Sequence, residues 1–394
     1  MKIYLKQNVL EAALDRVRRI YDEFDDIIVG MSGGKDSTVV MNLALTVAKE
    51  KNRLPLKVMF LDQEAEWQGT IDYITNIFSR EDVTPYWYQM PMVITNNASS
   101  YNRYNYCWDE KDKDKWIREK VDISIKENKY GTDRFHELFG AIMAKDMPQN
   151  SAKFAGVRAE ESPRRSMALT ESTTYKDITW GNKENPKLNQ YTFYPIYDWS
   201  YTDVWKYILD NNIEYNKIYD KMYQYGLDIR SMRVSNLHHE TAIQSLTYVQ
   251  EIEPETWNKV AERIDGANTI KHIKKNSFTC PAILPFMFSD WKEYALYLAN
   301  NIIQEDKYRD MLLHQVELHE KRYLDEPIKT EFWRTIINTI LSSDWDFTKF
   351  LNWTRSLDVF SYTAFNKGVY KSYMLKNTKY FTEDMKRKLV ERSA

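Results

Sequence analysis

The sequence predicts an α/β fold with a parallel sheet, followed by a mostly helical C-terminal region. Two short apolar runs, residues 27–31 and 57–62, are typical of buried strands, and both end in polar residues. Between them, residues 40–47 carry apolar side chains at helical spacing. A strand, a helix and a second strand form a βαβ unit, which builds a parallel sheet and gathers ligands at the carboxyl ends of its strands.

The alternation of helix and strand patterns continues on both sides of this unit. Pro195 closes the last strand pattern, so we expect an edge or terminal strand there. The S-x-x-D spacing from Ser200 to Asp203 predicts a capped helix. The other predicted elements are helices at residues 5–24 and 67–80 and strands at residues 86–90, 153–158 and 191–195.

The length of 394 residues predicts two domains, or one domain with large additions. Residues 96–150 lose the regular pattern, and the alternating charges of residues 109–115 are typical of a solvated segment, so we expect an insertion there. Beyond residue 237, strand patterns are sparse and helical periodicity dominates. The predicted division is a nucleotide-binding type of domain at residues 1–235 and a helical domain at residues 236–394.

Charge and cysteine content exclude several classes of protein. The formal net charge of -2 argues against a protein that coats nucleic acid by bulk charge. Cys107 and Cys280 are the only cysteines, which excludes a four-cysteine metal or iron–sulfur site within one chain and predicts a reducing compartment. No apolar run approaches the ~18 residues that span a bilayer. We therefore expect a cytoplasmic protein without a membrane partner.

The segment SGGKDS connects the first predicted strand to its helix. A phosphate needs several donors that converge without a side chain between them, and two glycines at a helix N-terminus supply that geometry. The lysine adds charge, and the aspartate can cap the helix amides or contact a magnesium ion on the phosphates. The alternative is a simple glycine turn, but the flanking strand and helix favour phosphate binding. The six residues are Ser32, Gly33, Gly34, Lys35, Asp36 and Ser37.

Acidic residues follow the second predicted strand. Asp62 ends that strand and is a candidate to contact magnesium or a nucleotide hydroxyl, the alternative being a cap for the next helix. Glu64 and Glu66 are further candidates for the same role.

These motifs resemble those of the PP-loop ATP pyrophosphatases, and more narrowly their phosphoadenosine phosphosulfate reductase-like branch. SGGKDS after a strand is the first match, and FLD at residues 60–62 lies where that branch ends its second strand in an acidic residue. GVRAEESPRR at residues 156–165 is similar to its G-x-R-x-x-E-S-x-x-R segment. YPIYDWSYTDVWKYI at residues 194–208 resembles its P-x-x-x-W-x-x-x-D-V-W-x-Y-I signature. The matches follow the family's order over about residues 26–212.

The resemblance implies an adenine nucleotide α-hydrolase-like (PP-loop) domain that binds ATP with Mg²⁺. Lys35 and Arg158 are the predicted catalytic residues, because both can stabilise negative charge. Asp36 and Asp62 are the predicted magnesium ligands. The other predicted nucleotide-binding residues are Gly156, Arg164 and Arg165. Arginine forks match phosphate oxygens in a bidentate way, the alternative being simple pairing of these arginines with Glu160 and Glu161.

The sequence departs from the sulfonucleotide reductases of this branch at their cysteines. Those enzymes use a cysteine in a Glu-Cys-Gly-Leu-His motif, and the assimilatory bacterial type adds paired cysteines for an iron–sulfur cluster. This chain has neither motif, and reads YGLDIRSMR at residues 225–233. Because thiol chemistry needs a thiolate, we expect no iron–sulfur cluster and no reduction by the family's route.

The arrangement is most similar to the immunoglobulin-binding regulator (IbrA) type, which lacks the redox cysteines and often accompanies a ParB and sulfiredoxin-like partner. The leading hypothesis is an ATP pyrophosphatase that adenylates a substrate and releases pyrophosphate. Two alternatives remain open. One is a nucleotide-sensing regulatory protein that works with such a partner, and the other is a sulfonucleotide-binding enzyme that borrows a partner's thiol.

Two other segments carry charge or possible ligands. His238, His239 and Glu240 are adjacent, and adjacent side chains on a helix point apart, so we predict no metal site there. Residues 367–394 hold eight Lys or Arg against three acids, interleaved with aromatic residues, which suits a nucleic-acid partner. A solvated terminal helix is the favoured alternative for this tail.

Overall fold

The computed structural model divides the chain into two compact units. The first comprises residues 1–94 and 104–263, and the second comprises residues 95–103 and 264–394. The sequence-based boundary at residue 235 therefore lies earlier in the chain than this division. The structure describes residues 6–96, 98–99, 102, 104–170, 172–234, 236–237, 243–270, 279–320, 326–344, 347 and 349–354.

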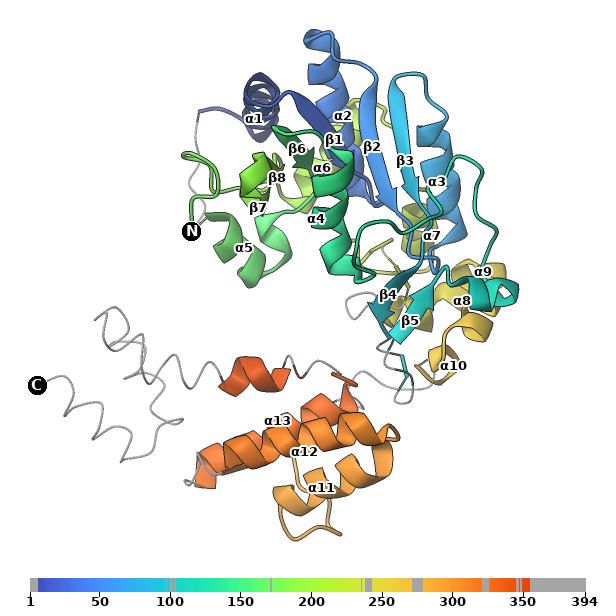
Figure 1. Cartoon of the computed structure of the whole chain (residues 1–394), viewed down its shortest axis with the longest axis vertical. Coiled ribbons are helices and arrows are strands. Elements are labelled where there is room, and N and C mark those ends of the chain that lie inside the picture. The colour runs from blue at the N-terminus through green and yellow to red at the C-terminus, as the bar shows by residue number, and fades with distance from the viewer. Residues whose placement is uncertain are drawn as a thin grey trace, which may run out of the picture. The chain divides into compact units, whose positions relative to one another are not determined.

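A six-stranded sheet forms the centre of the first unit, in the order β3-β2-β1-β6-β8-β7 (Figure 1). The first five strands run parallel, and β7 is antiparallel to β8. Val29 of β1 pairs with Val58 of β2 and with Phe154 of β6. The predicted parallel α/β fold is thus confirmed. The strands are β1 (Asp26–Gly30), β2 (Leu56–Leu61), β3 (Val83–Tyr88), β6 (Ser151–Phe154), β7 (Gly181–Asn185) and β8 (Gln190–Phe193).

The sheet order reverses at β1. The chain builds β2 and β3 on one side of β1 and then adds β6 on the other side. At such a switch point the connections leave the carboxyl ends of the two central strands in opposite directions, which opens a crevice for ligands. The turns after β1 and β6 therefore form the place where this fold is suited to bind a ligand.

Of the two alternatives predicted for residues 191–195, an edge strand or a terminal strand, the structure shows the second, because β8 is the last strand along the chain but does not lie at the edge. β8 lies between β6 and β7, and β7 occupies the edge. The sequence of β7, GNKEN, lacks the apolar alternation by which a strand is recognised. A buried ion pair helps to hold this polar strand, since Lys153 Nζ lies 3.2 Å from Glu184 Oε1.

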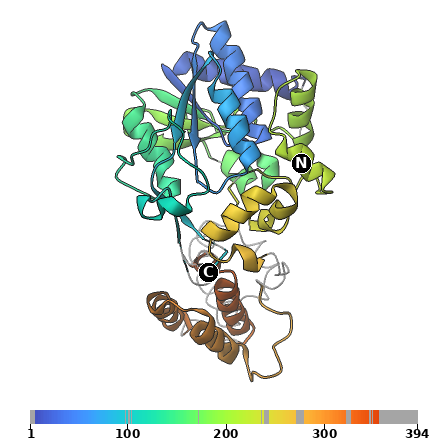
Figure 2. The same ribbon diagram turned by 90° about the vertical axis from the view of Figure 1, so that its right-hand side faces the viewer.

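Helices cover both faces of the sheet (Figure 2). Ile27 and Val29 of β1 face the core that contains α1, α2 and α6, whereas Ile28 faces the core that contains α4. This is the alternation expected of a strand buried on both faces. The helices of this unit are α1 (Val9–Glu23), α2 (Lys35–Glu50), α3 (Gln68–Phe78), α4 (Phe135–Asp146), α5 (Pro163–Thr170), α6 (Tyr201–Asp210), α7 (Ile218–Gln224), α8 (Val249–Ile252) and α9 (Pro254–Arg263).

The described part of the segment predicted as an insertion contains one strand of a short two-stranded sheet and a helix. β4 (Met92–Thr95) pairs with β5 (Tyr104–Cys107), and α4 follows before the chain enters β6. The capping box predicted at Ser200 is present at the start of α6, where the Ser200 side chain accepts the Asp203 amide.

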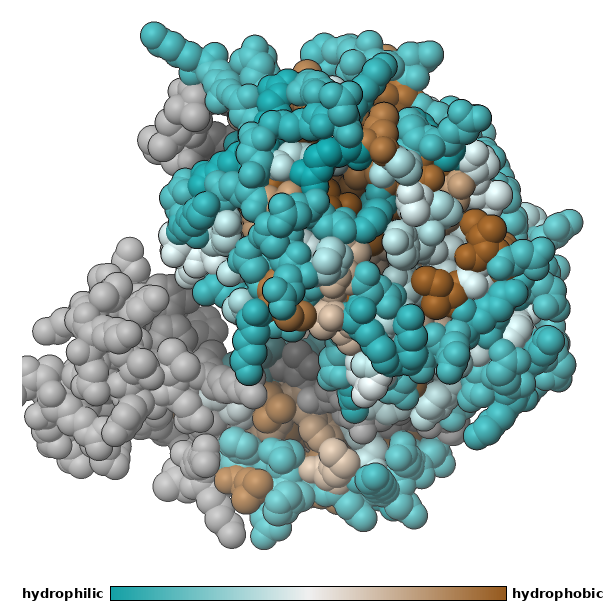
Figure 3. Space-filling view, turned by 45° about the horizontal axis from the view of Figure 1, so that its top comes forward, coloured by the Kyte–Doolittle hydropathy of each residue, from teal (hydrophilic) through white to brown (hydrophobic). Residues whose placement is uncertain are grey.

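From residue 264 onward, the described residues of the second unit form helices and connecting loops, as the sequence predicts. Its helices are α10 (Ala267–Ile270), α11 (Trp291–Ile302), α12 (Asp306–Glu320) and α13 (Glu326–Leu341). The helices α11, α12 and α13 enclose a separate core that includes Leu312, Phe332 and Ile337. Among the described residues, no helix is both long and apolar enough to cross a bilayer. The face drawn in Figure 3 is mainly hydrophilic, with small scattered apolar areas.

Candidate functional site

The phosphate-loop sequence forms the turn between β1 and α2. Gly33 has a φ of +72°, and a Cβ built there would lie 2.6 Å from Cγ2 of Thr70. Both the backbone conformation and the space therefore require glycine at this position. Gly34 caps α2 in extended conformation and contributes no side chain in front of the helix amides. The N-terminus of α2 is thus presented in the way that favours anions.

Hydroxyl groups hold the shape of this turn. The backbone amide of Ser32 donates to Ser37 Oγ at 3.2 Å, and Ser37 Oγ donates to the carbonyl of Gly34 at 2.9 Å. The Oγ atoms of Ser32 and Ser37 are 3.1 Å apart. Both serines therefore fix the loop to the first turn of α2.

Two residues that the sequence analysis missed also hold the loop. Asn216 donates through Nδ2 to the carbonyl of Gly33 at 3.2 Å and to Oγ1 of Thr70 at 2.8 Å. The backbone amide of Lys35 donates to the hydroxyl of Tyr219 at 3.1 Å. Burial and the negative charge of Asp36 raise the pKa of Tyr219, so this phenol is neutral. The only signal in the sequence was their position just after the D-V-W-x-Y-I segment.

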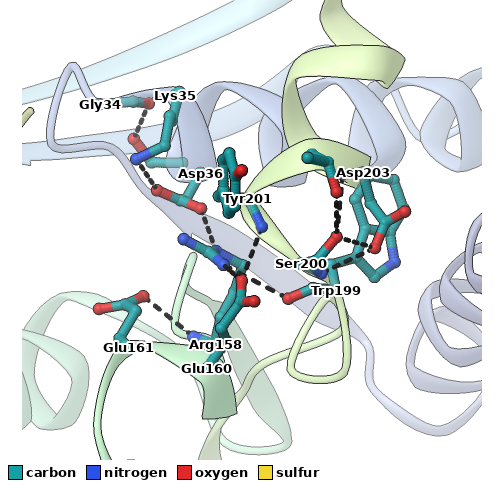
Figure 4. Close-up of polar contacts among 12 residues, drawn as sticks. Gly34, Lys35, Asp36, Arg158, Glu160, Glu161, Trp199, Ser200, Tyr201 and Asp203 are labelled. Carbon is teal, nitrogen blue, oxygen red and sulfur yellow. Dashed lines mark hydrogen bonds and ion pairs between the residues drawn. The ribbon is translucent and has the colours of Figure 1, made fainter. Parts of the chain in front are cut away.

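Asp36 lies between two cations (Figure 4). Its carboxylate is 3.1 Å from Lys35 Nζ and accepts a hydrogen bond from Nε of Arg158. Arg158 is 5% exposed, and its guanidinium also donates to Oε2 of Glu160 at 3.0 Å. The two predicted catalytic cations are therefore brought to one carboxylate from opposite sides of the switch point.

The lack of a side chain at Gly156 allows the turn after β6 to contact the backbone of the first turn of α2. A Cβ at this position would lie 2.7 Å from the carbonyl carbon of Asp36 and 2.7 Å from the amide nitrogen of Ser37. Only a glycine permits this approach of two backbones, and the approach places Arg158 against Asp36. The carboxylate of Glu161 accepts the Arg158 amide at 3.1 Å and pairs with Arg165. The side chain of Arg164 lies outside the described part of the structure.

Asp62 lies in a different polar cluster, at the carboxyl end of β2. Its Oδ2 accepts hydrogen bonds from Trp87 Nε1 and Gln89 Nε2, both at 2.9 Å. Its Oδ1 accepts the Glu64 amide at 2.9 Å and pairs with Arg118. Within the described residues, none of these partners belongs to the phosphate loop. Both oxygens of Asp62 are already engaged by the protein, and Asp62 is fully buried.

Glu64 and Glu66 extend this second cluster. Glu64 is buried and lies 2.7 Å from Nε of Arg263. Glu66 is also buried, and its Oε2 has no hydrogen-bond partner in the part of the chain that the structure describes. Burial, and then the negative charge of Asp62, raise the pKa of Glu66 well above its ordinary value. Burial therefore favours the protonated form of the Glu66 carboxyl group.

The substitution Glu66→Gln is expected to stabilise the protein at neutral pH. Because the folded-state pKa of Glu66 is raised, its contribution to stability is complete below the unfolded-state value near 4.5 and is lost as pH rises toward the folded-state pKa. Within that pH window, the free energy of unfolding of the wild type should fall by about 1.4 kcal/mol per pH unit relative to that of the variant.

Urea unfolding at pH 5 and pH 8 measures this difference. Glu64→Gln serves as the control and should destabilise the protein, because it leaves Arg263 without its buried carboxylate partner. The difference in free energy of unfolding between wild type and Glu66→Gln should change between the two pH values. If it is the same at both, the raised pKa of Glu66 is contradicted.

The other candidates for chemistry in the described residues are the two cysteines and possible metal ligands. Burial and the nearby charge of Glu64 raise the pKa of the Cys107 thiol well above its usual value, and partial burial raises that of Cys280. Neither is a ready thiolate. The described residues contain no group of three or more side chains placed to hold a metal ion. His238, His239, Glu240 and the tail at residues 367–394 lie outside them.

Comparison with known families agrees with the resemblance drawn from the motifs. Residues 26–225 match the Phosphoadenosine phosphosulfate reductase domain, so the chain belongs to that family. The matched domain is of the PP-loop type. Residues 226–338 match a second model, Domain of unknown function (DUF3440).

Individual relatives share this domain to different extents. The uncharacterized protein YbdN of Escherichia coli K12 is 28% identical over 386 residues, which cover 90% of this chain and 91% of YbdN. Sulfate adenylyltransferase subunit 2 of Vibrio cholerae is 24% identical over 233 residues, covering 55% of this chain and 67% of the relative. Among solved structures, a phosphate complex of phosphoadenylyl-sulfate reductase from Candida auris is 14% identical, covers 56% of this chain and 94% of its own, and has a TM-score of 0.30.

Proposed function

We propose that this chain binds ATP at the loop of residues 32–37 and adenylates a substrate, with release of pyrophosphate. The observation that carries the proposal is the convergence of Lys35, Asp36 and Arg158 at the N-terminus of α2. Family membership supports a nucleotide at this place, and the relatedness to a sulfate adenylyltransferase subunit supports adenylyl transfer.

In this proposal the loop binds the β- and γ-phosphates through its backbone amides. A substrate oxygen attacks the α-phosphorus, a new O–P bond forms, and the bond from the α-phosphorus to the departing pyrophosphate breaks. Lys35 and Arg158 stabilise the negative charge that develops on the phosphate oxygens. Because both cations are held by Asp36, they are already oriented before the nucleotide arrives.

Of the two predicted magnesium ligands, Asp36 is the one that is suited to hold the ion. Mg²⁺ typically takes one or two carboxylates together with phosphate oxygens and waters, and Asp36 beside the loop fits this pattern. When bound, the ion would be held in part by Asp36 and would offset phosphate charge. The oxygens of Asp62 are fully engaged by four protein donors, so we do not assign Asp62 this role.

Pyrophosphate release from ATP, measured with a panel of oxyanion and alcohol acceptors, tests the proposal. Lys35→Met should abolish release, whereas Lys49→Met, an exposed lysine in the last turn of the same helix, should leave it unchanged. Formation of orthophosphate without pyrophosphate would overturn attack at the α-phosphorus.

A second candidate function is nucleotide sensing, or sulfonucleotide binding with a thiol supplied by a partner of the ParB and sulfiredoxin-like kind. The raised pKa of both described cysteines favours this candidate over self-contained thiol chemistry. Calorimetry with ATP and with adenosine phosphosulfate separates the two hypotheses. Tight ATP binding without turnover supports sensing, and competition by adenosine phosphosulfate supports the partner-dependent enzyme.

A further inference from the structure

The segment that follows α7 returns to the phosphate loop. We refer to residues 228–234 and 236–237 as the Arg233 segment. Met232, Val234 and Leu237 of this segment are buried. A Cβ built on Gly34 would lie 3.7 Å from Cγ2 of Val234, and the amide of Leu237 donates to the carbonyl of Ala65 at 3.0 Å. The segment therefore runs from the phosphate loop to the turn after β2.

Arg233 lies between two of these buried anchors, and its side chain is exposed. Among the described residues, no carboxylate forms an ion pair with it. Its charge nevertheless reaches the site: partial burial lowers the pKa of Arg165, and the positive charges of Arg233 and Arg158 lower it further. Arg233 also acts electrostatically on Tyr219, whose hydroxyl accepts the Lys35 amide. The next residue, Val234, packs against Gly34, so Arg233 lies beside the loop in the chain.

Near the loop, the other arginines and Lys35 form ion pairs with carboxylates, whereas Arg233 forms none with the described residues. Arg158 is matched by Asp36 and Glu160, and Arg165 is matched by Glu161. Lys35 shares Asp36 with Arg158. Three arginines and a lysine therefore face three carboxylates, and the unmatched guanidinium is accessible. Such a group is suited to bind a multiply charged oxyanion in bidentate fashion.

We propose that Arg233 is a further anion-binding residue of the site and that it holds the terminal phosphates of the bound nucleotide, the part that departs as pyrophosphate. This inference rests on the proposed function, because it assumes a nucleotide at the loop. It assigns the Arg233 segment, whose Val234 lies beside Gly34, the role of contributing a cation to the phosphate site. Inorganic pyrophosphate should bind to the same place by itself.

Calorimetry on the full chain with ATP, inorganic pyrophosphate and adenosine tests this assignment. Arg233→Ala should weaken the binding of ATP and of pyrophosphate about 10-fold to 100-fold, as expected for the loss of charge-assisted hydrogen bonds. Adenosine affinity should not change. Arg233→Lys should fall between wild type and Arg233→Ala, because it keeps the charge but loses the planar fork.

Arg230→Ala is the matched control. Arg230 lies three residues earlier in the same segment, with its guanidinium 5.2 Å from the ring of Tyr201. Its loss should change pyrophosphate affinity less than 2-fold. An equal loss of affinity in both variants would indicate a general effect of net charge and would overturn the specific role of Arg233.

The remaining outcomes separate this inference from the proposed function. If the wild type binds ATP and pyrophosphate and Arg233→Ala binds both equally well, the inference is wrong and the proposed function stands. If the wild type binds neither ligand, both are wrong. Circular dichroism and thermal unfolding establish that each variant is folded, and Arg233→Lys gives the same comparison should Arg233→Ala be unstable.

Discussion

Replacing Gly156 by alanine is expected to abolish nucleotide binding and to lower the free energy of unfolding by about 1–3 kcal/mol. The added Cβ would meet backbone atoms of Asp36 and Ser37 at 2.7 Å, and backbone cannot rotate away as a side chain can. The first turn of α2 or the turn after β6 must therefore move, and either movement separates Arg158 from Asp36. Urea unfolding and calorimetry with ATP measure the two effects.

Gly140→Ala is the matched control for this substitution. Gly140 lies inside α4, and a Cβ there would meet only Glu184 Oε2 at 3.5 Å, an ordinary contact. Because alanine is a better helix former than glycine, this variant should be as stable as the wild type or more stable. If Gly156→Ala matches the control in stability and in ATP affinity, the close approach of the two backbones is not a requirement of the site.

Replacing Arg158 by alanine is expected to reduce pyrophosphate release about 100-fold to 1000-fold, the usual effect of removing one preorganised donor from a charged transition state. The loss also leaves the carboxylates of Asp36 and Glu160 without their shared partner. Arg158→Lys should recover only part of the activity, since one ammonium group cannot contact both carboxylates in the same geometry. Steady-state pyrophosphate release at saturating ATP is the measurement.

Arg80→Ala provides a comparison at an exposed arginine. Arg80 pairs with Asp82 at 2.7 Å on the surface, and its removal should leave turnover unchanged. Retention of more than half of the wild-type rate by Arg158→Ala would exclude a role for this guanidinium in the chemistry.

The parts of the fold that depend on local pattern were predictable from the sequence. The apolar runs of β1 and β2 and the helical spacing of α2 predicted the βαβ unit, and the glycine pair predicted the turn at Gly33 and Gly34. These features follow from interactions within a few residues. The family motifs extended the prediction to Arg158, whose position next to Asp36 depends on contacts across the sheet.

The parts that depend on distant contacts were not predictable in this way. Asn216 and Tyr219 hold the loop through hydrogen bonds to residues about 180 positions earlier, and no periodicity marks them. The role of Asp62 depends on Arg118, which comes from the segment predicted to be a solvated insertion. β7 was missed because its polar sequence is held by contacts with distant residues, namely its backbone pairing with β8 and the ion pair of Glu184 with Lys153.

The contacts of Asn216 and Tyr219 have a consequence for synthesis of the chain. The turn at Gly33 leaves the ribosome before Asn216 and Tyr219, yet these two residues from the region of α7 contribute groups that hold it. Domains generally fold as units during translation, so a nascent chain that ends before residue 216 carries the loop sequence without the groups that fix it. The loop therefore gains all the hydrogen bonds described here only after residues 216–219 have emerged.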